Sequence, residues 1–270
     1  MISSDKLQDL KKMIEDKGRL LVAYSGGVDS SLLAKVTHDV LGDGSLAVIL
    51  DSETMPRSEL QQARRLATSL GLNYREAKFS ILAEEPFAQN PATRCYICKK
   101  KSAKVLKGIA AAQGISCIAD GVNLSDYRDF RPGIAACDEE GIWHPFVDAA
   151  LTKADIRALA EILGLPVWNK PSSACLASRI AYDERITGES LRMVEEAEEF
   201  LKSRGFLQLR VRSHGRLARI ELLRPDMARA TMESGEIAKA LKDIGFDYVA
   251  LDLEGFRTGS MNEVLWTPRE

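Results

Sequence analysis

The chain has 270 residues, of which 45% are hydrophobic and 28% charged, and its formal net charge is -2 at pH 7. This balance argues against a chain built to coat nucleic acid, although it leaves room for a local basic patch. No apolar stretch approaches the 18 or so residues that a membrane span needs, so we expect a cytoplasmic protein without a membrane partner. The five cysteines, an odd number, indicate thiols rather than a secreted disulfide framework.

The first 170 or so residues alternate short apolar runs with longer helical patterns. A polar amphipathic helix over 1–18 opens the chain. The alternation predicts an α/β fold, with a parallel sheet covered on both faces and binding loops at the carboxyl ends of the strands. Strands are expected over 19–25, 45–51, 73–79 and 116–121, and helices over 31–41, 58–70, 99–113 and 153–163.

The pattern changes after residue 185, where a helix, two strands, a helix and a strand follow one another between 188 and 256. This order predicts a small α+β domain. We place the boundary near 183–187, which gives a first domain over 1–183 and a second over 187–270. Two segments before it, 121–150 and the one that begins at Asn169, have weak periodicity and predict irregular loops with a function.

Residues 24–31 read YSGGVDSS, between a predicted strand and a predicted helix. No lysine follows the glycines, so this is not a Walker A loop. The pattern SGGxDS resembles the PP-loop of ATP pyrophosphatases, which cleave ATP between its α and β phosphates. A plain Gly-Gly turn with a helix cap is the simpler interpretation. In the PP-loop interpretation, the pyrophosphate is held by Ser25, Gly26, Gly27, Ser30 and Ser31, magnesium by Asp29, and the nucleotide also by Asp51.

Cys95 and Cys98 stand in RCYICKKK, and Cys175 stands in PSSACLASRI. A closed zinc site needs four ligands, and a redox pair at 95 and 98 leaves Cys175 unexplained. Three thiolates can instead hold a cubic iron-sulfur cluster and leave one iron open to carry sulfur. Cys117 is expected in the core, and Cys137 is expected to be a bystander.

Seven motifs, taken in order, resemble the LarE family nearly from end to end. That resemblance implies an enzyme that uses ATP and Mg to activate a carboxylate of a pyridinium dicarboxylate mononucleotide and then converts it to a thiocarboxylate. The product leads to the nickel-pincer cofactor of lactate racemase. The motifs are SGGVDSS, NPATRCYICKKK, DGVNLSDYRDFRPG, HPFVDAALTKADIR, NKPSSACLASRI, VRSHGRLARIE and TGSMNEVL.

The family has two kinds of member. In one, a single cysteine at the position of Cys175 gives up its own sulfur; in the other, three cysteines hold a 4Fe-4S cluster that delivers external sulfide. Cys95, Cys98 and Cys175 are all present here, which favours the cluster-dependent kind. The resemblance also implies a homo-oligomer, such as a hexamer.

Further site residues follow from the matching motifs. Ser178 and Arg179 are expected to face the activated carboxylate. Arg210 and Arg212 lie two apart on a strand, so they share a face that can grip the mononucleotide phosphate or simply be solvated. Weaker candidates for Mg, phosphate or pocket contacts are Glu198, Glu199, Glu221, Lys100, Lys101, Asn123, Asp126 and Arg131, whereas His38, His144 and His214 show no ligand spacing.

Three other functions compete with this interpretation. A tRNA thiolase also uses a PP-loop, but it needs an extended phosphate-binding surface that a near-neutral chain without a basic module lacks. An amidating synthetase would need a source of ammonia, and nothing here resembles a glutaminase domain. A nucleotide sensor without turnover has no use for three cysteines near the site. A small-molecule substrate with a sulfide or other sulfur donor is therefore the expected pair of partners.

Overall fold

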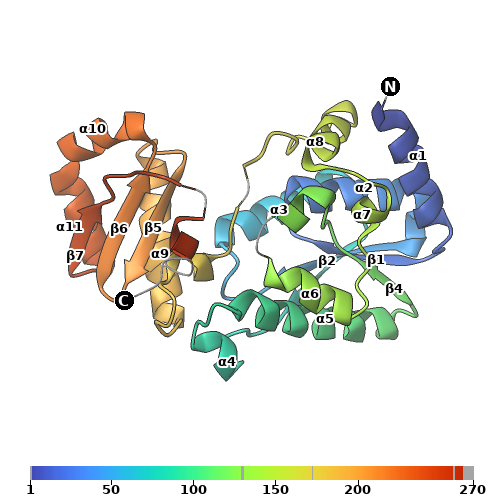
Figure 1. Ribbon diagram of the computed structural model, residues 1–270, viewed down its shortest axis with the longest axis horizontal. Coiled ribbons are helices and arrows are strands. Elements are labelled where there is room, and N and C mark those ends of the chain that lie inside the picture. Colours follow the sequence, from blue (N-terminus) through green and yellow to red (C-terminus); the bar gives the residue numbers. More distant parts are fainter. Residues whose placement is uncertain (1, 129–130, 172, 258, 264–270) are drawn as a thin grey trace. The chain divides into compact units, whose positions relative to one another are not determined.

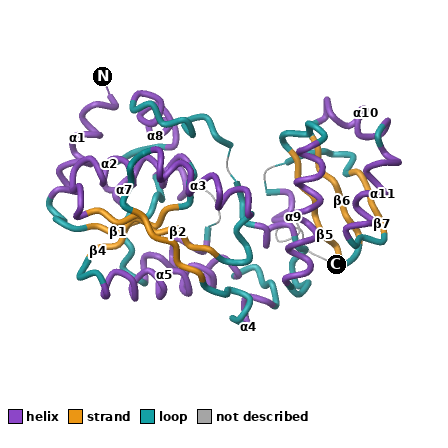
Figure 2. Tube along the Cα trace, turned by 180° about the vertical axis from the view of Figure 1, so that it is seen from behind, coloured by secondary structure: helices purple, strands orange, loops and turns teal. Residues whose placement is uncertain are grey.

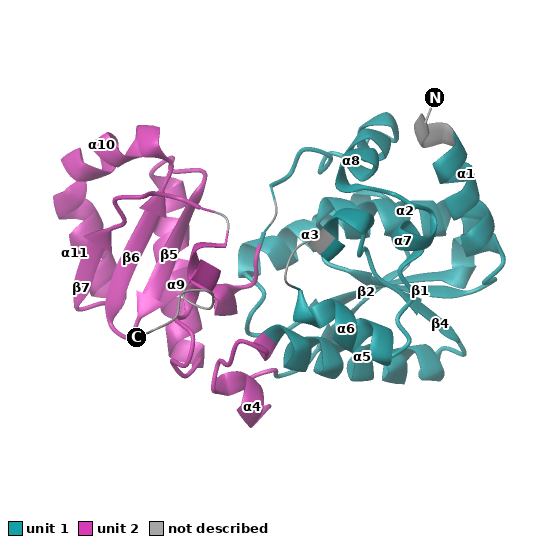
Figure 3. Cartoon of the chain, in the orientation of Figure 1, with its two compact units in different colours: residues 1–80, 95–173 teal, residues 81–94, 174–270 magenta. Residues whose placement is uncertain are grey.

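The computed structural model describes residues 2–128, 131–171, 173–257 and 259–263. The chain forms two compact units, coloured separately in Figure 3: unit 1 is Met1–Ser80 with Cys95–Ser173, and unit 2 is Ile81–Arg94 with Ala174–Glu270. This division lies earlier in the chain than the boundary we placed at 183–187, and the segment 81–94 joins the second unit rather than the first. No helix in the described ranges is both long and apolar enough to cross a membrane.

Unit 1 is built on a parallel sheet of four strands in the order β3-β2-β1-β4, which confirms the predicted α/β class. Leu20 pairs with Ser45 on one side and with Cys117 on the other, so β1 lies in the middle of the sheet. The order reverses at β1, since β2 lies on one side of it and β4 on the other. The strands are β1 (Leu20–Tyr24), β2 (Ser45–Asp51), β3 (Tyr74–Lys78) and β4 (Cys117–Ala119).

Helices cover both faces of this sheet, as Figures 1 and 2 show. Alternate residues of β1 point to opposite faces: Leu20 and Val22 pack with α1, α2, α3 and α8, whereas Leu21 packs with α5. Both clusters are buried, which fixes the register of the strands. The helices are α1 (Ile2–Glu15), α2 (Val28–Leu41), α3 (Arg57–Ser69), α5 (Arg94–Ala112) and α8 (Lys153–Ile162).

The segment 121–150 is more ordered than its weak periodicity predicts. It contains the short 3-10 helix η2 (Leu124–Arg128) and two short helices, α6 (Pro132–Glu139) and α7 (Pro145–Asp148). Both α-helices start at a proline, whose fixed φ suits the first turn of a helix. The expectation of an irregular loop over this range is therefore wrong for these residues.

Unit 2 contains a three-stranded mixed sheet in the order β5-β6-β7, with β5 antiparallel and β7 parallel to β6. The predicted α-β-β-α-β order is present, and an additional helix, α10, precedes α11. The short helix α4 (Glu85–Ala88) and the 3-10 helix η3 (Leu176–Arg179) also belong to this unit. The other elements are α9 (Gly188–Ser203), β5 (Leu209–His214), β6 (Leu217–Leu222), α10 (Arg224–Met232), α11 (Ser234–Ile244) and β7 (Tyr248–Leu251).

Candidate functional site

The loop after β1 turns sharply against α3. Gly26 has a φ of +73°, in the region that favours glycine. A Cβ at this position would lie 2.7 Å from Ala63 Cβ and 2.8 Å from Ala63 Cα, which is closer than atoms tolerate. The loop can therefore take this course only with glycine at position 26.

The serines of the loop are joined by hydrogen bonds at the start of α2. The hydroxyls of Ser25 and Ser30 lie 3.0 Å apart, and the Ser30 hydroxyl accepts from the Ser25 amide at 3.1 Å. Gly27 is the N-cap of α2, and no side chain caps the helix there. A helix start without a side-chain cap leaves amides directed at whatever occupies the loop, which suits an anion. Ser31, in contrast, is fully buried within α2.

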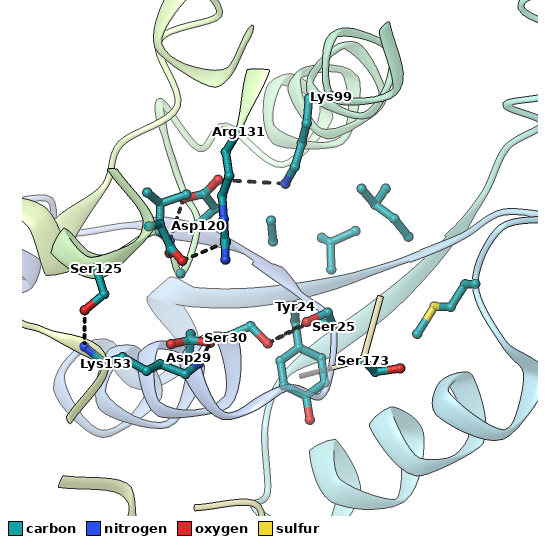
Figure 4. Close-up of a pocket in the computed structure, with 17 residues that line it drawn as sticks. Tyr24, Ser25, Asp29, Ser30, Lys99, Asp120, Ser125, Arg131, Lys153 and Ser173 are labelled. Carbon is teal, nitrogen blue, oxygen red and sulfur yellow. Dashed lines mark hydrogen bonds and ion pairs between the residues drawn. The ribbon is translucent and has the colours of Figure 1, made fainter. Parts of the chain in front are cut away.

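A hollow of about 650 Å³ opens at the carboxyl ends of β1 and β4, where the strand order reverses (Figure 4). Such a reversal is where open parallel sheets bind ligands. Apolar side chains from β1, β2 and the loop after β2 form one part of its wall, and charged side chains form another. Its polar lining comprises Tyr24, Ser25, Asp29, Ser30, Lys99, Asp120, Ser125, Asp126, Arg131, Lys153 and Ser173.

Asp29 lies on the first turn of α2 and is held from two sides. One carboxylate oxygen pairs with the ammonium of Lys153, at the start of α8, and the other accepts from the Asn123 amide at 3.3 Å. Asp126 accepts from Asn123 at 2.9 Å and pairs with Arg131 at 2.7 Å. Positive and negative groups thus alternate along this wall, and residues 129 and 130 of the loop lie outside the described residues.

Asp120 follows β4 and is buried in the wall of the hollow. Its Oδ1 accepts from the backbone amide of Val122 at 3.1 Å and lies 2.7 Å from Nδ1 of His144. Burial raises the pKa of Asp120, but the hydrogen bond with His144 and the charge of Lys99 outweigh it and hold that pKa below its usual value. Asp120 is therefore ionised at neutral pH.

Asp51 ends β2 and does not line this hollow. Its Oδ1 pairs with Arg57 Nη1 at 2.6 Å, and both residues line a more open hollow of about 500 Å³ with Lys78 and Phe79. The nucleotide contact predicted for Asp51 stays a prediction.

The two cysteines of the CxxC lie one turn apart at the start of α5. Cys95 is exposed and Cys98 half-buried, while Cys175, in unit 2, is exposed at the N-cap of η3. All are free thiols, so their donor chemistry fits an iron-sulfur cluster. Within each unit, the described residues bring together no group of three His, Cys, Asp or Glu side chains that could hold a metal ion. The cluster predicted for Cys95, Cys98 and Cys175 would need ligands from both units.

Arg179 is one of the most buried large side chains of the protein. Its guanidinium forms two parallel hydrogen bonds with Glu198, at 2.8 and 3.0 Å, and donates to the Cys175 carbonyl at 3.2 Å. It also donates to the Ser178 hydroxyl at 3.0 Å. Arg179 thus fixes the ACLASR segment, and Glu198, which we considered as a magnesium contact, is its counter-ion.

Arg212 has a similar arrangement on β5. It forms two hydrogen bonds with the fully buried Glu221, at 3.1 and 2.9 Å, and donates to the Ser178 carbonyl at 3.0 Å. Ser260 bridges the same pair, accepting from Arg212 at 2.9 Å and donating to Glu221 at 2.7 Å. Four of the five N–H donors of Arg212 are therefore already used within unit 2.

Arg210 differs from both, because it is half-buried and has no carboxylate hydrogen-bond partner among the described residues. Its guanidinium donates to the Leu209 carbonyl at 2.7 Å and lies over the Phe256 ring. Burial, followed by the nearby charge of Arg179, lowers its pKa to about 10, so it remains a cation at neutral pH. Of the two predicted phosphate ligands, Arg212 is already paired with a carboxylate, so Arg210 is better placed to bind an anion.

Sequence reasoning missed six polar residues of the hollow: Tyr24, Lys99, Asp120, Ser125, Lys153 and Ser173. Asp120 had a readable signal, because it directly follows a strand whose carboxyl end meets that of β1. Lys153 had none, since only the tertiary fold brings α8 to Asp29.

Some known proteins resemble nearly the whole chain, and others resemble parts of it. A family described as NAD synthase matches residues 4–92. An uncharacterised protein from Synechocystis sp. is 40% identical over 96% of this chain and 98% of its own length. The pyridinium-3,5-bisthiocarboxylic acid mononucleotide synthase of Lactiplantibacillus plantarum is 38% identical over 96% of this chain and 95% of its own length. One of the subunits of the glutamine-hydrolysing GMP synthase of Methanococcus maripaludis is 29% identical over 72% of this chain and 66% of its own.

Proposed function

The chain belongs to the LarE family of PP-loop enzymes, which use ATP in sulfur transfer, and on that premise we propose that it thiolates a pyridinium-3,5-dicarboxylate mononucleotide in nickel-pincer cofactor biosynthesis. The observation that carries the proposal is the 38% identity, across both units, with a synthase named for a bisthiocarboxylic acid mononucleotide. The amidation chemistry of the GMP synthase relative is less favoured, because that similarity covers only part of each chain.

The first step is adenylyl transfer at the hollow of unit 1. A carboxylate oxygen of the mononucleotide attacks the α-phosphorus of ATP, and pyrophosphate leaves with the electrons of the broken P–O bond. The amides at the start of α2 and the hydroxyls of Ser25 and Ser30 suit the pyrophosphate. Asp29 lies where it can help to hold Mg²⁺, which requires that its present partner Lys153 move toward a phosphate.

The second step replaces AMP by sulfur on the activated carboxyl carbon. Cys175 lies beside Ser178 and Arg179, in a segment that Arg179 holds by its carbonyl groups. Arg210 offers a half-buried cation on the same unit, which fits the phosphate of a mononucleotide.

The sulfur source divides the proposal into two forms. In the favoured form, Cys95, Cys98 and Cys175 would hold a 4Fe-4S cluster, which would supply a binding place for external sulfide. In the alternative, the exposed Cys175 gives up its own sulfur and becomes dehydroalanine. The presence of a CxxC at the start of α5 favours the cluster, because the sacrificial mechanism gives Cys95 and Cys98 no role.

The test is the identity of the nucleotide products. With Mg·ATP and the dicarboxylate mononucleotide, the full chain should release AMP and pyrophosphate in equal amounts. Asp29→Ala should abolish this release and leave the melting temperature within a few degrees, because the carboxylate lies in a pocket wall rather than the core.

Asp39→Ala is the matched control. Asp39 lies on the same helix, and its partner is Lys35, one turn away on the exposed face. Losing such a pair costs about 0.3–0.5 kcal/mol and should leave product release unchanged. ADP and phosphate as products, or full activity in Asp29→Ala, would contradict the proposed adenylylation.

A further inference from the structure

A row of alternating charges leads from α6 to the wall of the hollow in unit 1. Asp138 Oδ1 lies 3.2 Å from His144 Nε2, and His144 Nδ1 lies 2.7 Å from Asp120 Oδ1. Lys99 Nζ follows, 4.0 Å from Asp120 Oδ2. Asp120 and Lys99 line the hollow, whereas His144 lies behind Asp120 and is 7% exposed.

Both ring nitrogens of His144 lie near carboxylate oxygens. Nδ1 is hydrogen-bonded with Asp120 Oδ1, whereas Nε2 is buried, lies 3.2 Å from Asp138 Oδ1 and makes no hydrogen bond among the described residues. Two carboxylates at this range favour the imidazolium over the neutral ring. The electrostatics agree: burial lowers the pKa of His144, but its hydrogen bond with Asp120 and the charges of Asp120 and Asp138 outweigh it and raise that pKa.

The carboxylate of Asp120 lies between two positive groups, the His144 ring and the Lys99 ammonium. Its Oδ1 has two partners, but its Oδ2 is buried and has no hydrogen-bond partner among the described residues. Lys99 Nζ lies just beyond hydrogen-bonding distance of that oxygen, and its side chain is 47% exposed. If His144 loses its proton, Lys99 is the one cation that the described residues leave beside this buried carboxylate, and attraction draws it to Oδ2.

We propose that His144 is a positioning residue for ATP, whose imidazolium neutralises Asp120 and so leaves the Lys99 ammonium free to bind the phosphates. The inference rests on the ATP chemistry proposed above. ATP affinity should accordingly fall as the pH rises and His144 loses its proton.

Two neighbours of this row, a thiol and a phenol, stay in one state near neutral pH. Burial raises the pKa of Cys137 to about 11, and burial followed by surrounding carboxylates raises the pKa of Tyr127, so both remain neutral. Asp148, on α7, accepts from the indole of Trp143 at 2.7 Å. His144, whose pKa is raised above its ordinary value, is thus the group of this cluster that loses a proton as the pH rises from the neutral range.

The experiment measures binding of Mg²⁺ with a non-hydrolysable ATP analogue to the full chain at pH 6 and pH 8. Relative to the wild type at pH 6, His144→Gln should bind on the order of tenfold more weakly at both pH values, and the wild type should bind more weakly at pH 8 than at pH 6. His38→Gln is the control, because His38 contacts Ser45 rather than the hollow. In the double variant His144→Gln/Asp120→Asn, removal of the carboxylate frees Lys99 and should restore binding.

Nuclear magnetic resonance provides a readout that needs no destabilising variant. Because coupling between two binding events is reciprocal, the analogue should shift the titration of the His144 ring to higher pH. Three histidines in the chain make the resonance assignable. An unshifted titration, or wild-type binding by His144→Gln at pH 6, would overturn the role of His144 alone. A wild type that binds no nucleotide at either pH would overturn the ATP chemistry as well.

Discussion

Two arginine side chains of unit 2 are neutralised inside the protein. Arg179 pairs with Glu198 and Arg212 with Glu221, each through two hydrogen bonds, and all four side chains are buried. Burial raises the pKa of Glu198, but the charge and hydrogen bonds of Arg179 outweigh it and lower that pKa. Loss of one partner would leave a buried charge uncompensated, which is far more costly than losing a surface pair.

Arg212→Ala should therefore lower the free energy of unfolding of unit 2 by about 3 kcal/mol, because the buried Glu221 would keep, among the described residues, only the more distant Arg219, at 3.4 Å, as a counter-ion. Denaturant unfolding of the full chain measures this loss. Arg210→Ala, two residues away on the same strand, is the control and should cost much less, since Arg210 has no carboxylate hydrogen-bond partner in the described part of the chain. Equal losses in the two variants would contradict the importance of the buried pair.

The same two variants also test whether Arg210 binds the phosphate of the mononucleotide. Weaker binding of the mononucleotide to Arg210→Ala, with stability retained, would report contact with its phosphate, worth roughly 1.5–3 kcal/mol. Alternation along a strand correctly predicts that Arg210 and Arg212 share a face. It could not predict that one of them pairs with a glutamate of the next strand, because that pairing depends on the register of β5 with β6.

At the scale of elements, the sequence predicts the helices and strands whose apolar residues recur at a regular spacing. The four strands of unit 1 and the helices α2, α3, α5 and α8 lie close to the predicted ranges. The elements that were missed bury little apolar surface. Within α10, Ala230 is the one buried residue, and α6 buries mostly small residues, so neither produces a clear period.

Gly26→Ala tests the turn between β1 and α2. The new methyl would meet the backbone of Ala63 on α3, so the loop must move, and we expect at least a tenfold loss of ATP binding. Gly71→Ala is the matched control: Gly71 has a similar φ of +67°, but a Cβ there meets nothing within 4 Å. It should cost about 1–2 kcal/mol of stability and leave ATP binding intact. Isothermal titration calorimetry with the non-hydrolysable analogue separates the two, and equal binding losses would contradict this role of the Gly26 contact.

At the scale of the whole molecule, the predicted cluster ligands are divided between the units. Cys95 and Cys98 belong to unit 1, and Cys175 belongs to unit 2. Sequence motifs could nominate these cysteines because spacing and residue type are local. They could not place one pair relative to the third residue, since that depends on how the units associate.

If the three cysteines hold one cluster, alanine at Cys95, Cys98 or Cys175 should in each case abolish thiolation and remove most of the iron, because two thiolates retain a cubane poorly. Iron and acid-labile sulfide analysis of anaerobically purified protein measures this. Cys117→Ala is the control, because Cys117 lies within β4 and should leave iron content unchanged.

The sacrificial alternative gives a different pattern. Cys95→Ala would stay active, Cys175→Ala would be inactive, and the spent wild type would lose roughly the mass of hydrogen sulfide at residue 175. Intact mass spectrometry after turnover distinguishes the two, and dehydroalanine in active, iron-free protein would contradict the cluster.

The discontinuity of unit 2 has a consequence for biosynthesis on the ribosome. The segment 81–94 is held by residues made much later: Asn90 donates to the Ala181 carbonyl at 2.7 Å, and the Ala88 carbonyl accepts from the Ile186 amide at 2.8 Å. At about 5–20 residues per second, these partners emerge on the order of ten seconds after it. Phe87 is 2% exposed in the folded protein, but during that interval the rest of unit 2, into which it packs, has not been made. The nascent chain thus carries an exposed aromatic segment through the synthesis of the second part of unit 1, Cys95–Ser173, a stage at which a chaperone could bind it.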